Sequence, residues 1–137
     1  MRKTLFNQFQ AVGIYVIFFV IAFSFPAFAE EPVNCYARYV NTLEVGGCFE
    51  KQLKKYDTEL NSTYQAVMEK LKVRGTWGSL KKAQREWIKY RDQNCMFHSD
   101  LYFGGSAAGP AYVECKARMT KERSDELNIV LEDLNRH

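Results

Sequence analysis

The sequence predicts an all-α protein, a small disulfide-stapled helical bundle of three main helices preceded by a short N-terminal helix. Apolar residues recur every three or four positions over three long stretches, which is the period of a helix packed on one side. Short links containing glycine separate the first two stretches, so these helices should be antiparallel neighbours. The four cysteines are an even number, which is typical of a small exported domain held by two disulfides.

Residues 1–29 are predicted to be a secretory signal peptide. Arg2 and Lys3 precede the charge-free stretch 4–29, whose centre is almost wholly apolar and which ends in an A-x-A cleavage motif at Ala29. The protein is therefore expected in the periplasm or outside the cell.

Two other interpretations of this segment keep the protein on the membrane. The apolar run is long enough to serve as an uncleaved anchor, although its strongly apolar centre is short. A lipoprotein would need a cysteine directly after the apolar run, whereas Cys35 follows five further residues, 30–34. We expect no stable membrane anchor after cleavage.

The mature chain, 30–137, has the size of one helical domain with a modest core. Without Arg2 and Lys3 it carries 17 basic and 16 acidic residues, a formal charge of +1. Nothing in this balance indicates nucleic-acid binding.

All four cysteines lie in the mature part, and the sequence permits three pairings. We favour Cys35 with Cys48 and Cys95 with Cys115, because each bond closes a short loop that is worth about 3 kcal/mol in the chain-entropy model. Zinc binding by Cys95, His98 and Cys115 is an alternative that lacks an evident fourth ligand. Thioredoxin-like chemistry would need a C-x-x-C pair, which is absent. No metal or cofactor is expected.

The first predicted elements are a weakly signalled short helix at 36–43 and a long helix between 48 and 72. The long helix has no internal proline or glycine, and its apolar positions step by three and four. The glycines of 74–78 are expected to end it, with Ser79 capping the next helix. Its apolar stripe consists of Leu53, Tyr56, Leu60, Tyr64, Val67, Met68 and Leu71.

The next predicted helix, 80–95, is amphipathic. Its charged residues lie mainly on one side and the other side should face the core. Two members of the inward side, Gln84 and Arg91, are polar and need partners from another helix. The predicted inward side consists of Leu80, Ala83, Gln84, Trp87, Ile88, Arg91 and Cys95.

A glycine-rich loop at 101–109 separates this helix from the last one, 111–135. Pro110 suits the first position of that helix. The loop carries Tyr102 and Phe103 beside Gly104, Gly105 and Ser106, and a Cys95 to Cys115 bond would brace both of its ends.

Several of these residues together resemble the LprI-like lysozyme inhibitor family. The specific part is the pattern Ala-Gln-Arg-x-Trp-Ile-x-x-Arg-Asp-x-x-Cys at 83–95, and the resemblance spans nearly all of the mature chain. It implies a small, exported, helical and cysteine-stapled protein. The other matching positions are Cys35, Cys48, Asp57, Leu60, Asn61, Tyr64, Leu80, Gly104, Gly105, Ser106, Cys115, Thr120, Arg123 and Leu127.

The matching residues divide into a packing group and a polar group. The cysteines, Leu60, Tyr64, Trp87, Ile88 and Leu127 are expected to pack. Asp57 or Asn61 is expected to accept hydrogen bonds from Arg91 or Arg123 in a network that also contains Gln84 and fixes the register of the helices. A direct binding role for the polar group is the alternative.

The resemblance implies a non-enzymatic inhibitor of a lysozyme or another cell-wall-degrading enzyme. His98 and His137 lie in no recognisable nucleophile arrangement, so catalysis is not expected. Lysozyme acts through two carboxyl groups in an open cleft, and a rigid loop at 102–106 would block that cleft. In the alternative view of this loop, its glycines permit a sharp turn and its aromatic rings enter the core.

The charge of +1 predicts no long-range attraction to a basic lysozyme, although Asp100 and Glu114 border the loop. The second candidate function is therefore a periplasmic interaction or immunity-type module with another envelope partner.

Overall fold

Four α-helices account for nearly all of residues 33–137, the part of the chain that the computed structural model describes. They are α1 (Cys35–Arg38), α2 (Thr42–Arg74), α3 (Trp77–Asp100) and α4 (Ala108–Arg136), and no strand occurs in this part of the chain. The predicted all-α class, with three main helices and a short first one, is confirmed. The predicted signal peptide lies outside the described residues.

The short helix predicted at 36–43 is divided differently in the structure. α1 ends at Arg38, and Thr42 already belongs to α2. Asn41 separates the two helices, because its backbone is extended and its side-chain oxygen accepts a hydrogen bond from Glu44 N at 2.9 Å. An asparagine followed three residues later by glutamate is a known helix-start signal, which the prediction overlooked.

The turn between α2 and α3 ends α2 at glycine, as predicted, but Ser79 does not cap α3. Gly75 has a left-handed backbone with φ 72°, and its N–H bonds to Lys72 O at 3.1 Å. The N–H of Thr76 bonds to Leu71 O, also at 3.1 Å, which completes a Schellman motif. This turn uses so few residues that α3 begins at Trp77, and Ser79 lies within its first turn.

The last helix also begins earlier than predicted. α4 starts at Ala108, so Pro110 is its third residue rather than its first. Proline is tolerated there because the amide groups of the first helical turn have no carbonyl partner inside the helix.

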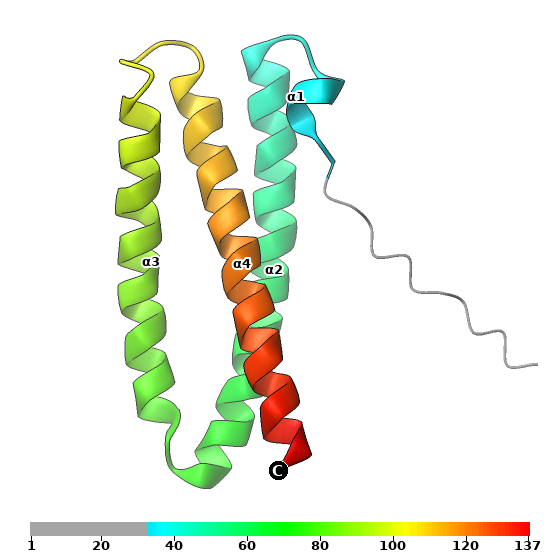
Figure 1. Ribbon diagram of the computed structural model, residues 1–137, viewed down its shortest axis with the longest axis vertical. Coiled ribbons are helices and arrows are strands. Elements are labelled where there is room, and N and C mark those ends of the chain that lie inside the picture. Colours follow the sequence, from blue (N-terminus) through cyan, green and yellow to red (C-terminus); the bar gives the residue numbers. More distant parts are fainter. Residues whose placement is uncertain (1–32) are drawn as a thin grey trace, which may run out of the picture. The chain divides into compact units, whose positions relative to one another are not determined.

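α4 lies between the other two long helices (Figure 1). It packs closely along α2, where its small buried residues Ala117, Thr120 and Ser124 let the two backbones approach, and α3 packs chiefly on α4. Because α3 has one main neighbour, only a narrow stripe of it is covered. Ala83 and Ile88, predicted to face the core, are exposed, with Ile88 at 41%.

Both disulfides have the predicted pairing. Cys35 and Cys48 join α1 to α2 with an S–S distance of 2.07 Å, and Cys95 and Cys115 join α3 to α4 with 2.04 Å. The second bond closes the base of the α3–α4 loop and uses two of the three ligands of the alternative zinc site, which is therefore ruled out. Cys48 lies near the start of α2, Cys95 near the end of α3 and Cys115 near the start of α4, and these helix ends lie at the same end of the bundle (Figure 1).

Candidate partner-binding site

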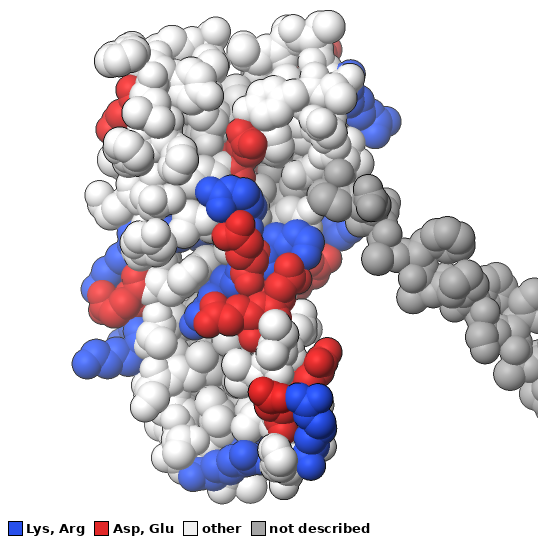
Figure 2. Space-filling view, in the orientation of Figure 1, with Lys and Arg blue, Asp and Glu red and all other residues white. Residues whose placement is uncertain are grey.

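The end of the bundle that carries both disulfides differs in surface character from the rest. We call residues 33–50 and 95–115 the disulfide end, and residues 51–94 and 116–137 the stem. On the face shown in Figure 2, the disulfide end is mostly uncharged, whereas charged side chains gather over the middle of α4. The large apolar residues exposed at the disulfide end are Val33, Tyr36, Val40, Leu43, Met96, Phe97, Leu101, Tyr102 and Phe103.

The predicted binding loop, 102–106, lies at the tip of this end between α3 and α4 (Figure 1). Consecutive backbone turns form it: Phe103 N donates to Asp100 O at 3.0 Å, and Gly105 N donates to Tyr102 O at 2.8 Å. Ala108 N then donates to Gly105 O at 2.9 Å as the chain enters α4. The loop is therefore an ordered turn whose two ends are joined by a disulfide.

Phe103 occupies an unusual position in this loop. Its side chain is 97% exposed, and its backbone lies in the left-handed region with φ 49°. That region is unfavourable for a bulky side chain, while the next residue, Gly104, adopts φ 75° without this cost. Tyr102 is 47% exposed. Neither ring enters the core, in contrast to the alternative considered for the loop.

The remaining loop residues line neighbouring surfaces. A Cβ atom on Gly105 would lie 3.1 Å from Tyr102 O, so a larger residue would crowd the turn. Ser106 lines a groove of about 410 Å³ between the first turns of α2 and α4, together with Leu43 and Pro110.

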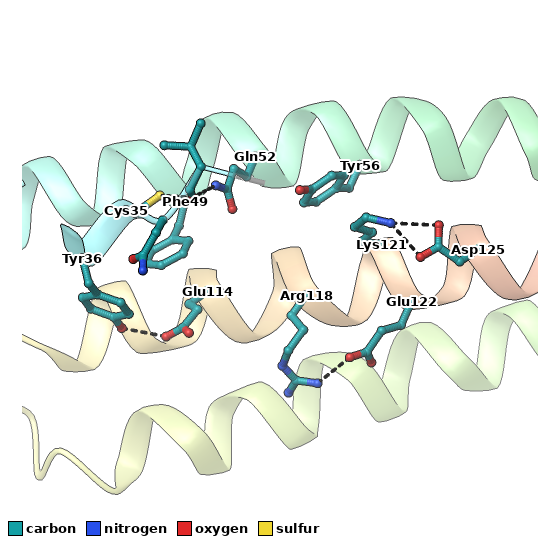
Figure 3. A pocket seen from close by; sticks show the side chains of 12 residues that line it. Cys35, Tyr36, Phe49, Gln52, Tyr56, Glu114, Arg118, Lys121, Glu122 and Asp125 are labelled. Atoms are coloured by element: carbon teal, nitrogen blue, oxygen red, sulfur yellow. Dashed lines mark hydrogen bonds and ion pairs between the residues drawn. The ribbon is translucent and has the colours of Figure 1, made fainter. Parts of the chain in front are cut away.

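A larger groove, about 520 Å³, lies beneath α1 and is walled by α2 and α4 (Figure 3). Phe49 and Tyr56 of α2 supply apolar surface, and Gln52 Nε2 donates to Val33 O at 2.5 Å, which holds the segment before α1 against α2. Its volume falls in the range of small-ligand and side-chain sites.

The rim of this groove combines a tyrosine with charged residues of α4. Tyr36 Oη donates to Glu114 Oε2 at 2.6 Å, and the two side chains point toward one another in Figure 3. Partial burial, followed by this hydrogen bond and the charge of Glu114, raises the pKa of Tyr36 well above its ordinary value. Further along α4, the hydrogen bond from Lys121 to Asp125 raises the pKa of that lysine.

The predicted polar network lies in the stem, away from the loop. Arg91 is buried, and its Nη1 is 3.0 Å from Thr120 Oγ1 and 3.4 Å from Asp57 Oδ1. Its Nε donates to Asp92 at 3.0 Å. The guanidinium carbon lies 5.2 Å from the centre of the Trp87 ring, so the arginine also stacks on an aromatic face.

Arg123 forms a second polar contact between α4 and α3. Its Nε donates to Gln84 Oε1 at 3.0 Å. Its guanidinium carbon lies 5.9 Å from the centre of the Trp87 ring, the same ring on which Arg91 stacks. Asn61 is exposed, and none of the contacts that the structure describes for Arg91 or Arg123 includes it. Of the five polar residues, Asp57 therefore contacts Arg91 and Gln84 contacts Arg123, while Asn61 joins neither pair.

Two residues for which the sequence predicted no contact complete these sites. Thr120 is fully buried and accepts from Arg91, and Tyr36 reaches Glu114 across 78 positions of sequence. Nothing local in the sequence connects either pair. Within residues 33–137, no cluster of histidine, cysteine, aspartate or glutamate has a geometry suited to a metal ion.

Comparison with known proteins decides the family. The family model described as "Lysozyme inhibitor LprI" matches residues 35–127, which include the disulfides, the loop and both arginine contacts. The chain belongs to the LprI lysozyme inhibitor family. An uncharacterized protein of Rhizobium meliloti (strain 1021) is 30% identical over 119 residues, which cover 78% of this chain and 86% of that protein. No solved structure matches the chain.

Membership in the LprI family indicates a lysozyme inhibitor, which is a protein-binding role. It also suggests a protein of the periplasm or the extracellular space, where lysozymes act. None of the helices in the described part of the chain combines the length and apolar character needed to cross a membrane.

Proposed function

We propose that this protein, exported by its predicted signal peptide, inhibits a lysozyme by inserting the 102–106 loop into the active-site cleft. Family membership supports the class of partner, and the loop geometry supports the mode of inhibition. Occlusion needs no chemistry from the inhibitor. It needs a protruding group of suitable shape held in one conformation.

The observation that carries this proposal is Phe103. An aromatic side chain exposed at 97% gains almost nothing from the fold, and its left-handed backbone costs about 1 kcal/mol or more. The surrounding hydrogen bonds and the Cys95 to Cys115 bond hold it there all the same. A strained, exposed and well-ordered aromatic residue is typical of a binding contact, because rigid aromatic anchors lose little entropy on association.

Tyr102 and the glycines complete the proposed contact. Tyr102 offers a second aromatic surface with a hydroxyl, and Gly104 and Gly105 leave the backbone open to close approach by the partner. In the cleft, this unit would cover the two catalytic carboxyl groups and exclude the glycan substrate.

The proposal is tested by measuring hydrolysis of bacterial cell walls by several lysozymes, animal and bacterial, with the purified oxidised protein 30–137 present. We expect inhibition of at least one enzyme at or below micromolar concentration. Replacing residues 104–106 should abolish inhibition while the circular dichroism spectrum stays helical. Inhibition of none would disprove the function, and unchanged inhibition by the replacement would move the contact to the helices.

A second candidate is another envelope partner, in an interaction or immunity-type role. Val40 and Leu43 support it, because they lie exposed in the link between α1 and α2 and in the first turn of α2, and extend the apolar surface beyond one loop. Cross-linking in intact cells, with Leu43→Ala as the test variant, would reveal such a partner as a band that depends on Leu43 and does not depend on the loop.

A further inference from the structure

Glu114 differs from most of the other charged residues of its helix, which form ion pairs. Further along α4, Arg118 pairs with Glu122 at 3.0 Å, and Lys121 pairs with Asp125 at 2.7 Å. Glu114 is half-buried, and among the described residues its polar contact is the hydroxyl of Tyr36, with no basic partner. A carboxylate accepts several hydrogen bonds, so most of its capacity remains open.

Two tyrosines flank this carboxylate. Glu114 lines the large groove together with Tyr36, and it also lines a smaller groove of about 200 Å³ together with Tyr102 and His98. Tyr36 and Tyr102 are close enough for the charge of one phenol to affect the other. They are 52% and 47% exposed, so both rings remain accessible. A carboxylate with two exposed aromatic rings nearby suits a cation, which gains an ion pair and contact with a ring.

Arg118 is the basic residue that lines both grooves with Glu114 and would oppose this. However, its guanidinium is engaged by Glu122, and Figure 3 shows it directed away from the hydroxyl of Tyr36. Its charge is therefore largely balanced by a carboxylate on its own helix. Glu114 has no such balance.

The distribution of charge along the bundle favours a basic partner at the same place. The disulfide end has one basic and four acidic residues, which gives a net charge of −3. The stem has 16 basic and 10 acidic residues, which gives a net charge of +6. The residues concerned at the disulfide end are Arg38, Glu44, Glu50, Asp100 and Glu114.

Screening makes the local charge more important than the total. α2 has 33 residues, and at about 1.5 Å per residue it is roughly 50 Å long. Charges are largely screened beyond about 8 Å at physiological salt. A protein that approaches the disulfide end is therefore influenced by the negative charge of that end. The net charge of +1 of residues 30–137, from which no attraction was predicted, does not describe this local field.

We propose that Tyr36, Tyr102 and Glu114 form a recognition site for a lysine or arginine side chain of a basic protein partner. This inference rests on the proposed function for the identity of that partner. The aromatic loop fills the cleft, while Glu114 selects a basic residue at its edge. The site lies on α1, the loop and α4. One disulfide joins α1 to α2, the other closes the base of the loop, and the bond from Tyr36 to Glu114 connects α1 to α4.

The first test measures affinity for a basic lysozyme that the protein inhibits. Glu114→Gln keeps the shape and the ability to accept from Tyr36, and removes the charge. We expect about tenfold weaker binding, while Glu114→Asp retains most of the affinity. Glu132→Gln is the matched control, because it makes the same change at an exposed position near the other end of α4. Equal affinities for the two glutamine variants would overturn the inference.

The second test needs no lysozyme. N-acetyl-arginine amide is titrated into the oxidised protein, and the ring resonances of Tyr36 and Tyr102 are followed by NMR, with N-acetyl-citrulline amide as the neutral isostere. We expect saturable shifts at millimolar concentration for the arginine compound, and their loss in Glu114→Gln. Equal shifts with citrulline, or no shift, would contradict the site.

The two tests separate the two proposals. Arginine binding in a protein that inhibits no lysozyme would support the site and disprove the function. Inhibition that is insensitive to Glu114→Gln would support the function and disprove the site.

Discussion

The disulfide end and the stem differ in how many of their polar and apolar groups are paired or buried within the fold. In the stem, several basic residues pair with acidic residues of their own helix, as in Lys89 with Glu86 at 3.0 Å, and the half-buried Arg123 reaches Gln84 on α3. At the disulfide end, aromatic rings are exposed to solvent and Glu114 lacks a basic partner among the described residues. The stem thus uses many of its polar groups within the fold, whereas the disulfide end leaves a carboxylate and several aromatic rings open to a partner.

The same division applies to what holds each region together. The stem contains an apolar cluster around Leu60, Val67 and Leu127, with further partly buried side chains from all three long helices. The disulfide end has smaller clusters, each of which includes disulfide cysteines. Covalent bonds replace hydrophobic burial where the surface is kept apolar and open, because a residue committed to a partner contributes little to the core.

Loss of the Cys95 to Cys115 bond should have the largest effect on the free energy of unfolding, because this bond stabilises the disulfide end. The Cys95→Ala and Cys115→Ala double variant should lower the free energy of unfolding by about 3 kcal/mol, because the loop between them becomes free in the unfolded chain. Urea denaturation followed by circular dichroism measures this. Inhibition should weaken as well, since the loop loses its brace. A loss below about 1 kcal/mol would show that the stem alone stabilises the bundle.

Arg91→Met tests whether the stem cluster is structural. It should lower the free energy of unfolding by about 2 kcal/mol, because the buried Thr120 hydroxyl loses its donor and Trp87 loses a stacked guanidinium. Lysozyme inhibition at 25 °C should be unchanged. Arg85→Met, on the exposed side of the same helix, is the control and should change neither property. A loss of inhibition without a loss of stability would place the binding site in the stem.

Phe103→Ala should separate binding from stability at the disulfide end. We expect inhibition to weaken about tenfold, equivalent to about 1.4 kcal/mol, with no loss of stability, because the side chain makes almost no contact within the fold. Val73→Ala is the control, since Val73 is similarly exposed at the opposite end of α2. Equal inhibition by the two variants would refute the role of the loop.

The smallest expected effect concerns pH. Partial burial and the bond to Glu114 raise the pKa of Tyr36 in the folded state, so the folded protein holds this proton more tightly than the unfolded chain. The associated stability is present below about pH 10, the ordinary pKa, and is lost as the pH rises above it. Wild-type protein should therefore lose more thermal stability between pH 9 and pH 11 than Tyr36→Phe does. Tyr90→Phe, an exposed tyrosine of α3, should behave as the wild type.

Much of the fold was predictable because it depends on local rules. The three long helices follow from a period of three to four, and the end of α2 follows from Gly75, which supplies the left-handed residue of the turn. The starts of α2 and α4 were misplaced by several residues. α2 begins after the Asn41 cap, which the prediction overlooked, and α4 begins after Ala107, whose side chain makes no cap that the sequence could have signalled.

The candidate site was predictable only in part. The sequence pointed to 102–106 as a loop and to Glu114 as its neighbour. It contained no sign that Phe103 would be exposed in a left-handed conformation or that Tyr36 would bond to Glu114. Both features arise where α1 and the loop lie against α4. Periodicity is a property of one segment, so it cannot predict contacts between segments that are distant in sequence.

The sequence by itself determined the helical class, the cysteine framework and the family, because helix periodicity and cysteine spacing are properties of the chain. Tertiary structure decided which members of each helical face are buried and which polar groups meet. Ile88 repeats with the correct period and is nevertheless exposed, because α3 has one main neighbour, α4. Periodicity fixes the direction of a side chain around its helix, and only the packing of other helices determines whether anything covers it.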